Sequence, residues 1–295
     1  MAGDDKRTSS GRFSKNNHYS PRKRGSPIDY RMRRILFILL LLYPILLQAE
    51  VVEHENVLKL KYGGVWQVDP YLSPLRYAGQ SVGIGNEWWQ AFSKHNNWSH
   101  VGAIDLMGQW SYNVPKTNRL SGLSVQVGWG AYYHWDWQDK GLQVLVGPYL
   151  EAELMARYLT SNINKPYSMD LGIQAQAMAG LSWSFSGKKT SYRLRYLAHL
   201  NMIGVDFMPD YFASYYELSE GVLKGTFRCA GLWNHQALRH ELTLDLQFPH
   251  STWRVGAEHL FLHYGTKEMQ FNRNQVSLVI GCLFRYKIKP AERFR

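Results

Sequence analysis

Residues 169–185 read MDLGIQAQAMAGLSWSF, and this stretch decides the fold class. Its odd-numbered positions are Met, Leu, Ile, Ala, Trp or Phe, whereas its even-numbered positions are Asp, Gly, Gln, Ser and a single Met. Successive side chains of a β-strand point to opposite faces. This period of two therefore predicts one long strand with an apolar face and a polar face.

The same alternation recurs along the chain after residue 50. It is clear at 123–135, 142–158, 192–202, 238–248 and 276–288, and weaker at 57–67, 78–92, 98–112 and 252–265. Together the stretches predict about ten strands, within a range of roughly 8–12, and an even number is typical of single-chain outer-membrane barrels. We therefore expect an all-β fold, an antiparallel up-and-down transmembrane β-barrel.

The predicted connections alternate in length. The segments 138–141, 186–189 and 249–251 are tight, whereas 113–121, 159–166, 207–234 and 266–273 are longer. Counted back from the last strand, the tight turns fall at the end of the barrel that holds both chain termini. Short periplasmic turns and longer extracellular loops are typical of outer-membrane barrels.

Alternation alone does not separate a membrane barrel from a soluble barrel or sandwich, whose apolar face points inward. The predicted strands exceed the roughly five or six residues usual in soluble sheets and suit a tilted membrane span. Aromatic rings prefer the headgroup level of a bilayer, and here they gather near the ends of the apolar faces. These residues are Trp110, Tyr112, Tyr133, Trp135, Tyr158, Trp183, Phe185, Phe248, Trp253 and Tyr286.

The N-terminal part of the chain predicts export. Residues 1–31 are polar and basic, and 35–47 are apolar apart from Pro44. A basic segment, a short apolar run and Ala49 at a cleavage position are typical of a signal peptide, whereas the alternative, a retained helix, needs about 20 apolar residues. The long prefix makes Met32 a candidate for the true start. We expect a basic prefix and signal peptide at 1–49, a periplasmic lead-in at 50–56, the barrel at 57–288 and a basic tail at 289–295.

The charge distribution argues against a nucleic-acid partner. Of the formal net charge of +11, residues 1–49 contribute ten Lys or Arg against three Asp or Glu, and the remaining chain 24 against 20. A nearly balanced mature chain has no basic surface for phosphates. Cys229 and Cys282 lack a paired metal spacing and differ in expected depth, so we expect no metal, no cofactor and no disulfide. The expected partners are outer-membrane lipid and the machinery for secretion and barrel assembly.

The polar face of the predicted strands carries charges that a small barrel must hold inside. The register places Arg157 near Asp170 and Asp245 near Arg254. A buried charge without a partner is costly, so a structural network that fills the lumen is one interpretation; a charged pathway or binding cavity, and hence a narrow channel or transporter, is the other. The residues of this predicted network are Glu151, Glu153, Arg157, Asp170, Arg193, Arg195, Glu241, Asp245, Arg254 and Arg285.

A catalytic constellation is not evident, so no catalytic residue is assigned. His259 and His263 share the apolar face of 252–265 with Phe261. Two explanations remain open. A β-bulge near Glu258 resets the faces and turns Leu260 and Leu262 outward, or the histidines serve a lipid-modifying enzyme. We favour the bulge, because nucleophilic catalysis needs a nucleophile, a base and an orienting group within reach of one another.

The connection 207–234 is the most individual feature of the chain. It contains Tyr211, Phe212, Tyr215 and Tyr216, and so many aromatic residues in one extracellular loop favour a binding role for an unknown extracellular ligand. A loop that folds over the barrel mouth and buries its own rings is the alternative. The sequence thus predicts an outer-membrane barrel of structural or binding type.

Several segments resemble a family of uncharacterised exported proteins from Bacteroidota, over residues 57–288. The resemblance implies an outer-membrane-type barrel with no known activity, so it assigns no catalytic residue. The chain departs from the usual barrel ending, since a basic tail follows Tyr286. The segments that carry the resemblance are Tyr62-Gly63-Gly64, Gly83-Ile84-Gly85-Asn86-Glu87, Pro209–Leu218, Leu232-Trp233-Asn234-His235, Glu241-Leu242-Thr243-Leu244-Asp245 and Ser277-Leu278-Val279-Ile280-Gly281.

Overall fold

The computed structural model describes residues 52–92, 97–187, 190–207, 227–265 and 269–288. The described residues are almost entirely β-structure, with one short 3-10 helix, η1, at Gln138–Lys140. Within these ranges, no helix has the length and apolar character that crossing a membrane requires. The predicted segments 1–49 and 289–295, with Met32 and Ala49, lie outside the described residues. Of the predicted lead-in 50–56, residues 50–51 also lie outside them, whereas residues 52–56 are part of the first strand, so the barrel begins earlier than predicted.

All ten predicted strands are present, most of them longer than expected. They are β1 (Val52–Asp69), β2 (Ser73–Ala91), β3 (Trp98–Asn113), β4 (Arg119–Trp137), β5 (Leu142–Leu159), β6 (Tyr167–Ser186), β7 (Ser191–Phe207), β9 (His235–Gln247), β10 (Thr252–Gly265) and β11 (Gln270–Ile288). An eleventh, β8 (Phe227–Gly231), is short.

The ten long strands close into one antiparallel barrel. Each pairs with its neighbour along the chain, β6 pairs with β7, and β1 pairs with β11, so no strand edge of the ring is left open. The short strand β8 pairs with the last residues of β7, beyond the point where β9 ends its own pairing with β7. The connection 207–234 is therefore not loop throughout: it contains this strand.

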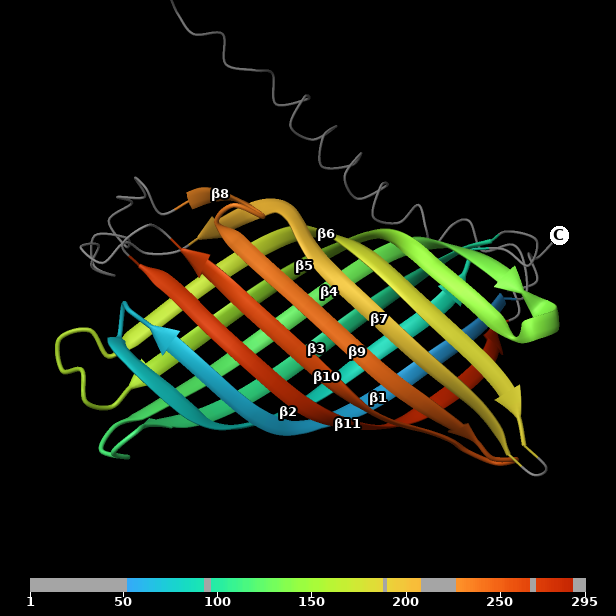
Figure 1. Ribbon diagram of the computed structural model, residues 1–295, viewed down its shortest axis with the longest axis horizontal. Helices are drawn as coiled ribbons and strands as arrows, with labels where there is room; N and C mark the ends of the chain where they lie inside the picture. The colour runs from blue at the N-terminus through green and yellow to red at the C-terminus, as the bar shows by residue number, and fades with distance from the viewer. Residues whose placement is uncertain (1–51, 93–96, 188–189, 208–226, 266–268, 289–295) are drawn as a thin grey trace, which may run out of the picture. The chain divides into compact units, whose positions relative to one another are not determined.

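The strands run obliquely to the barrel axis (Figure 1). A path that leaves β1 at Glu55 and follows cross-strand partners around the barrel comes back to β1 near Gln67. Such a stagger requires strongly tilted strands. The tilt lets strands of 13 to 20 residues form a wall of membrane-like height.

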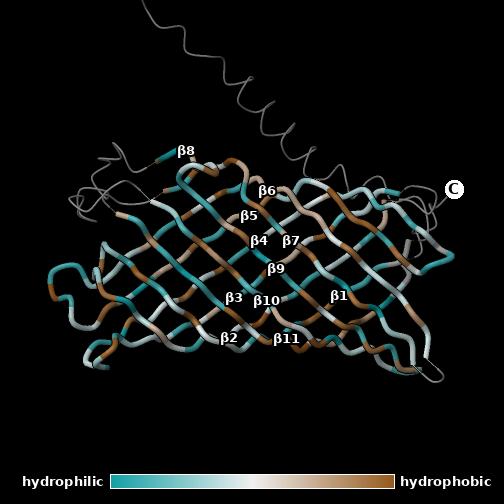
Figure 2. Tube along the Cα trace, in the orientation of Figure 1, coloured by the Kyte–Doolittle hydropathy of each residue, from teal (hydrophilic) through white to brown (hydrophobic). Residues whose placement is uncertain are grey.

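The barrel is apolar outside and charged inside. On β1, Leu60 is 60% exposed, whereas Lys59 and Lys61 beside it are 2% and 3% exposed. The same alternation runs around the ring (Figure 2). A soluble barrel has the opposite polarity. This inversion is the physical requirement for a barrel in lipid, where the outside meets hydrocarbon and the strand hydrogen bonds must be satisfied internally.

Aromatic side chains mark both ends of this apolar exterior. At the end where β1 begins and β11 ends, which we call the terminus-side end, rings two residues apart on the same strand are in contact: Tyr133 lies 4.9 Å from Trp135 on β4, and Trp183 lies 4.9 Å from Phe185 on β6. At the opposite, far end, Tyr158 lies 4.8 Å from Tyr167. Two such belts are expected where a barrel meets the interfaces of a bilayer.

The predicted asymmetry of the connections is only partly correct. The turn between β1 and β2 spans just residues 70–72 at the far end, because both strands continue further than the sequence pattern indicated. The difference in length between the two ends therefore depends mainly on 160–166 and on the chain between β7 and β9.

The predicted bulge near Glu258 is wrong. The pairing of β10 with β9 and β11 continues without a shift, and Leu260 and Leu262 are buried rather than outward. His259 does lie on the outer face, where its Nε2 is 3.1 Å from Asn274 Oδ1. His263 Nδ1 is 2.5 Å from Asn272 Oδ1. These polar partners satisfy the histidines on the exterior, so the strand needs no bulge.

Candidate functional site

The terminus-side half of the lumen is built around Glu87 of β2. Its carboxylate receives Lys59 Nζ at 2.8 Å, an Arg195 nitrogen at 2.8 Å and Arg254 at 2.9 Å. All four side chains are at most 5% exposed. Three cations on one carboxylate bring an excess of positive charge that neighbouring acids must balance.

Asp245 of β9 supplies part of that balance. It is the direct cross-strand partner of Arg254 and accepts from two guanidinium nitrogens, at 2.6 and 3.1 Å. Arg193 donates to the same carboxylate at 3.1 Å and also to Glu55 at 2.8 Å. Arg285 joins Glu55 at the barrel rim, at 2.8 Å. The result is a continuous chain of ion pairs from the rim to the middle of the barrel.

The middle of the lumen holds a second set of pairs. Lys61 contacts Asp105 at 2.9 Å and Glu258 at 2.8 Å. Arg239 donates to Glu151 at 2.6 Å. Arg273 approaches Glu153 at 3.4 Å. All of these pairs join strands that are not neighbours, and Arg273 of β11 and Glu153 of β5 lie on opposite sides of the ring, so that contact crosses the lumen.

Glycines on the inner face make room for these large side chains. A Cβ at Gly128 would lie 1.9 Å from the Tyr149 hydroxyl, and one at Gly130 would lie 2.6 Å from the same ring. A Cβ at Gly85 would lie 2.0 Å from Asp105 Oδ1. Alternating small and large inner residues fill a narrow barrel, which accounts for glycine inside these strands.

The far mouth of the lumen is capped by apolar and aromatic side chains. The β1–β2 turn folds inward, and Tyr71 and Leu72 are 8% and 5% exposed. Asn162 from the β5–β6 connection donates to the Leu72 carbonyl at 3.0 Å. The cap consists of Tyr71, Leu72, Tyr77, Leu120, Met155, Leu159, Leu262, Tyr264, Met269 and Phe271.

Arg157 ties this cap to the charges below it. Its guanidinium lies 4.2 Å from the centre of the Phe271 ring and pairs with Asp69 at 2.6 Å and with Asp170. The Tyr264 hydroxyl donates to the same Asp170 at 2.5 Å. A fully buried guanidinium with two carboxylates and a ring face is a well-satisfied charge.

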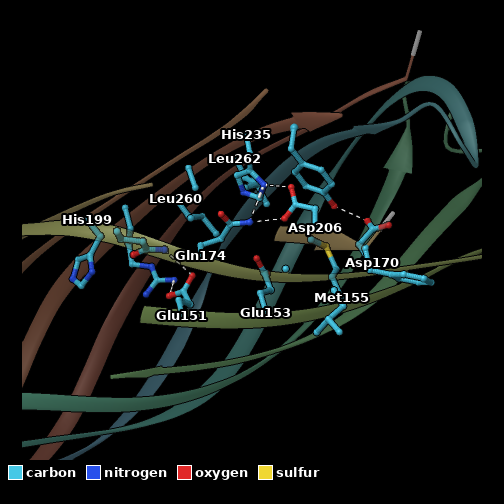
Figure 3. A pocket seen from close by; sticks show the side chains of 17 residues that line it. Glu151, Glu153, Met155, Asp170, Gln174, His199, Asp206, His235, Leu260 and Leu262 are labelled. Atoms are coloured by element: carbon cyan, nitrogen blue, oxygen red, sulfur yellow. Dashed lines mark hydrogen bonds and ion pairs between the residues drawn. The ribbon is translucent and has the colours of Figure 1, made fainter. Parts of the chain in front are cut away.

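A small pocket lies beneath the cap (Figure 3). On its wall, His235 Nδ1 is 2.6 Å from Asp206 Oδ2, and Gln174 donates to the other oxygen of that carboxylate at 2.5 Å. The His235 ring stacks on Tyr264 at 5.1 Å. The pocket has a volume of about 30 Å³, enough for one or two water molecules but not for a metabolite.

The Asp206–His235 pair has the orientation of a general base held by a carboxylate. However, the residues that line the pocket include no Ser, Thr or Cys that could act as a nucleophile. Among the described residues, no cluster of three or more His, Cys, Asp or Glu could hold a metal ion. The geometry fits a buried polar network with water better than a reaction centre.

The predicted lumen residues all lie on the inner face, and the pair Arg157–Asp170 and the pair Asp245–Arg254 are in contact. Glu241 lies 3.5 Å from Lys59. The other members join the ion pairs described above, with Arg285 at the exposed rim. The four loop aromatics Tyr211, Phe212, Tyr215 and Tyr216 lie outside the described residues. Both cysteines are free.

Several residues of the network were missed from the sequence. Lys59, Lys61, Glu87 and Asp105 lie in the weaker predicted strands, where the same alternation with Leu58, Leu60, Ile84 or Ile104 would have placed them inside. The Asp206–His235 pair had no such signal, because both residues lie beyond the predicted ends of their strands, 192–202 and 238–248.

These features define the class of the protein: a closed ten-stranded antiparallel β-barrel with an apolar exterior and a lumen filled by buried charges. The chain belongs to the family described as Protein of unknown function (DUF3316), whose model matches residues 35–283. No curated protein matches the chain by sequence.

Solved structures with a similar barrel include the outer membrane protease OmpT from Escherichia coli, with a TM-score of 0.46 and 7% identity over 82% of this chain and 98% of that chain. The transport unit of the autotransporter AIDA-I from Escherichia coli has a TM-score of 0.42 and 7% identity, over 82% and 91%. The beta domain of the Bordetella autotransporter BrkA has a TM-score of 0.40 and 10% identity, over 78% and 98%. At these TM-scores the likenesses carry no argument of their own.

Proposed function

We propose that the protein is an integral outer-membrane β-barrel of structural or binding type, with a sealed lumen. The observation that carries this proposal is the inversion of polarity, with exposed Leu60 and Leu278 outside and buried Lys59 and Arg254 inside. In water such an exterior would expose a large continuous apolar surface, which drives aggregation. In lipid the same surface is satisfied, and the closed ring leaves no strand edge unpaired.

The lumen favours a closed barrel over a channel or transporter. Ion pairs cross it at two levels, between Arg195 and Glu87 and between Arg273 and Glu153, and the far mouth carries the cap centred on Tyr71 and Phe271. An open pore would need a continuous water path between the two ends. Neither a narrow channel nor a lipid-modifying enzyme using His259 or His263 is favoured, since those histidines already bond to asparagines on the exterior.

Export to the outer membrane follows from this placement. We propose that 1–49 is a basic prefix and signal peptide, that the lead-in is shorter than the predicted 50–56 because β1 already begins at Val52, and that 289–295 is a basic tail. Secretion and barrel-assembly machinery would then be its transient partners, and the resemblance to exported proteins of Bacteroidota supports the same route.

The extracellular surface would carry any binding role. The longest connection between barrel strands lies at the far end, and the sequence places Tyr211, Phe212, Tyr215 and Tyr216 in it. Aromatic side chains supply much of the binding energy of protein surfaces. We therefore propose this segment as the surface for an extracellular ligand.

Fractionation and conductance test the proposal. The full chain, expressed in a bacterium with an outer membrane, should fractionate with that membrane and resist alkaline extraction. Its migration on a denaturing gel should change on heating, as expected for a closed barrel. The purified protein should give no stepwise conductance in a planar bilayer, with an open porin as the positive control. A soluble, heat-insensitive protein would contradict the barrel proposal, and reproducible conductance steps would contradict the sealed lumen.

A further inference from the structure

A groove of about 730 Å³ crosses the outer surface of the barrel near its far rim. Successive cross-strand partners form its floor, each on the next strand around the ring. From β10 to β3 these partners are Phe261, Asn274, Trp66, Ala78 and Tyr112. The floor is mainly apolar, and Trp66 is 52% exposed.

Basic side chains lie at one end of this groove. Arg76 and Lys116 line it, and Arg119 is the direct cross-strand partner of Tyr112. All three are exposed. Among the described residues, no acidic side chain forms an ion pair with any of them, in contrast to the arginines of the lumen. The groove therefore joins an apolar floor to a cluster of positive charges that have no counterion among the described residues.

The position of Lys116 is held by the backbone around it. Its φ is 57°, a left-handed conformation that is unusual for a residue other than Gly, Asn or Asp. Buried Asn113 fixes this turn: its backbone accepts from the Lys116 amide at 2.9 Å, and its side chain accepts from the Asn118 amide and donates to Thr117, both at 2.9 Å. Backbone strain of this kind concentrates at functional sites.

We infer that this groove binds an anionic lipid, with its phosphorylated headgroup at Arg76, Lys116 and Arg119 and its acyl chains along the apolar floor. The site rests on the proposed membrane placement, because only then does the groove lie at the interface of a bilayer. The aromatic rings of Trp66 and Tyr112 mark that level. Below them the exposed Tyr62 and Leu60 of β1 continue the floor toward the aliphatic exterior.

Charge and shape together favour a lipid over other occupants. A protein partner would need acidic groups spaced to match these cations, and nothing in the groove specifies such a spacing. A phosphorylated lipid instead offers an anionic headgroup to the cations and acyl chains to the apolar floor. A free phosphate ion could bind the cations but has no acyl chain to contact the apolar floor. A phosphorylated lipid is therefore the occupant that fits both the cations and the apolar floor.

Binding of lipid A by the purified, folded full chain in neutral-detergent micelles tests this inference. The probe is bis-phosphorylated lipid A, and the control ligand is the same glycolipid without phosphates. Native mass spectrometry measures the binding of each. The phosphorylated form should bind more tightly. Each juxtamembrane cation contributes about fivefold to such binding, so Arg76→Gln with Lys116→Asn should weaken it by about 30-fold. Asn is chosen at 116 because it tolerates the left-handed conformation.

Two controls separate the outcomes. Lys140→Gln removes an exposed cation at the terminus-side end and should leave binding unchanged. Trp66→Leu keeps an apolar floor but removes the ring, and should weaken both lipids equally. Equal binding of the two lipids, or an unaffected double variant, would overturn the site. Displacement of lipid A by inorganic phosphate, added at the concentration at which lipid A itself binds, would also overturn the site. Heat-dependent gel migration on the same samples reports separately whether the barrel itself has formed.

Discussion

The two halves of the lumen are sealed by different chemistry. In the terminus-side half, Glu87, Arg254 and Asp245 each serve several partners at once, so no single pair stands alone. In the far half, fewer charges remain, and the aromatic cap around Tyr71 and Phe271 covers them. A barrel can thus be filled either by mutually satisfied charges or by apolar packing.

This difference indicates which substitutions should destabilise the barrel most. Removing one member of a shared ion network leaves several buried charges without partners, a cost that burial in a medium of low dielectric makes large. Removing one ring of the cap leaves a cavity, whose cost is limited by local rearrangement. Exterior positions should matter least where the new side chain is also apolar and of similar size, because its contact with lipid is kept.

The largest effect is expected for Arg254→Leu. The substitution leaves Asp245 and Glu87 each short of a cation and should lower the free energy of unfolding by about 3–5 kcal/mol. Urea unfolding of the refolded protein in lipid vesicles measures it. Arg285→Leu is the matched control at the solvent-exposed rim and should cost less than about 1 kcal/mol. Similar losses for both variants would contradict the interpretation of the terminus-side network.

Phe271→Ala should have a somewhat smaller effect in the far half. The ring is buried between Arg157 and Tyr264, and its loss should lower the free energy of unfolding by about 3 kcal/mol. Phe284→Leu, on the outer face of the same strand, is the control, because it keeps an apolar contact with lipid, with a loss expected below about 1 kcal/mol. If the two variants unfolded at the same urea concentration, the cap would not contribute to the stability of the barrel.

Asp206→Asn should lower the free energy of unfolding by about 1–2 kcal/mol, because the amide keeps the size of the side chain but weakens the hydrogen bond to His235. Asp139→Asn, in the exposed η1 turn, should leave the unfolding midpoint unchanged. Thermal unfolding followed by gel migration is the measurement. A neutral effect of Asp206→Asn would mean that the pair with His235 does not stabilise the fold.

The smallest effect is expected for His259→Leu. The imidazole lies on the outer face beside His240, 6.0 Å between ring centres, and its loss removes one hydrogen bond to Asn274. A leucine there gains contact with lipid, so the change in unfolding free energy should stay within about 1 kcal/mol. A loss of more than about 2 kcal/mol would show that the exterior polar pairs stabilise the barrel as the interior ones do.

The sequence predicted the strands and their faces well, because alternation is a local signal that the membrane enforces on every strand. The charges 157 and 170, and 245 and 254, were paired correctly because each pair lies on two strands that follow one another in the chain, so a single connection sets their register. Contacts across the lumen, such as Arg273 with Glu153 or Arg195 with Glu87, depend on the tilt and closure of the whole ring. No local pattern encodes that geometry.

The histidines of β10 show where the interpretation of the sequence failed. Their position on the apolar face suggested a break in the strand, because polarity was read one strand at a time. The asparagines that satisfy them, Asn272 and Asn274, lie on the neighbouring strand β11. Knowledge of the pairing would have removed the need for a bulge.

The central claim is that apolar side chains of this barrel face lipid while its polar side chains fill a sealed lumen. Ser277 and Leu278 are neighbours on β11, with exposed fractions of 1% and 65%. In a chain with Cys229→Ser and Cys282→Ala, single cysteines at these positions can be reacted with a maleimide dissolved in the bilayer or with a charged, water-soluble one. We predict that Leu278→Cys reacts only with the lipid-dissolved reagent and Ser277→Cys with neither until the protein is unfolded. Reaction of Leu278→Cys with the water-soluble reagent in the folded protein would contradict the account.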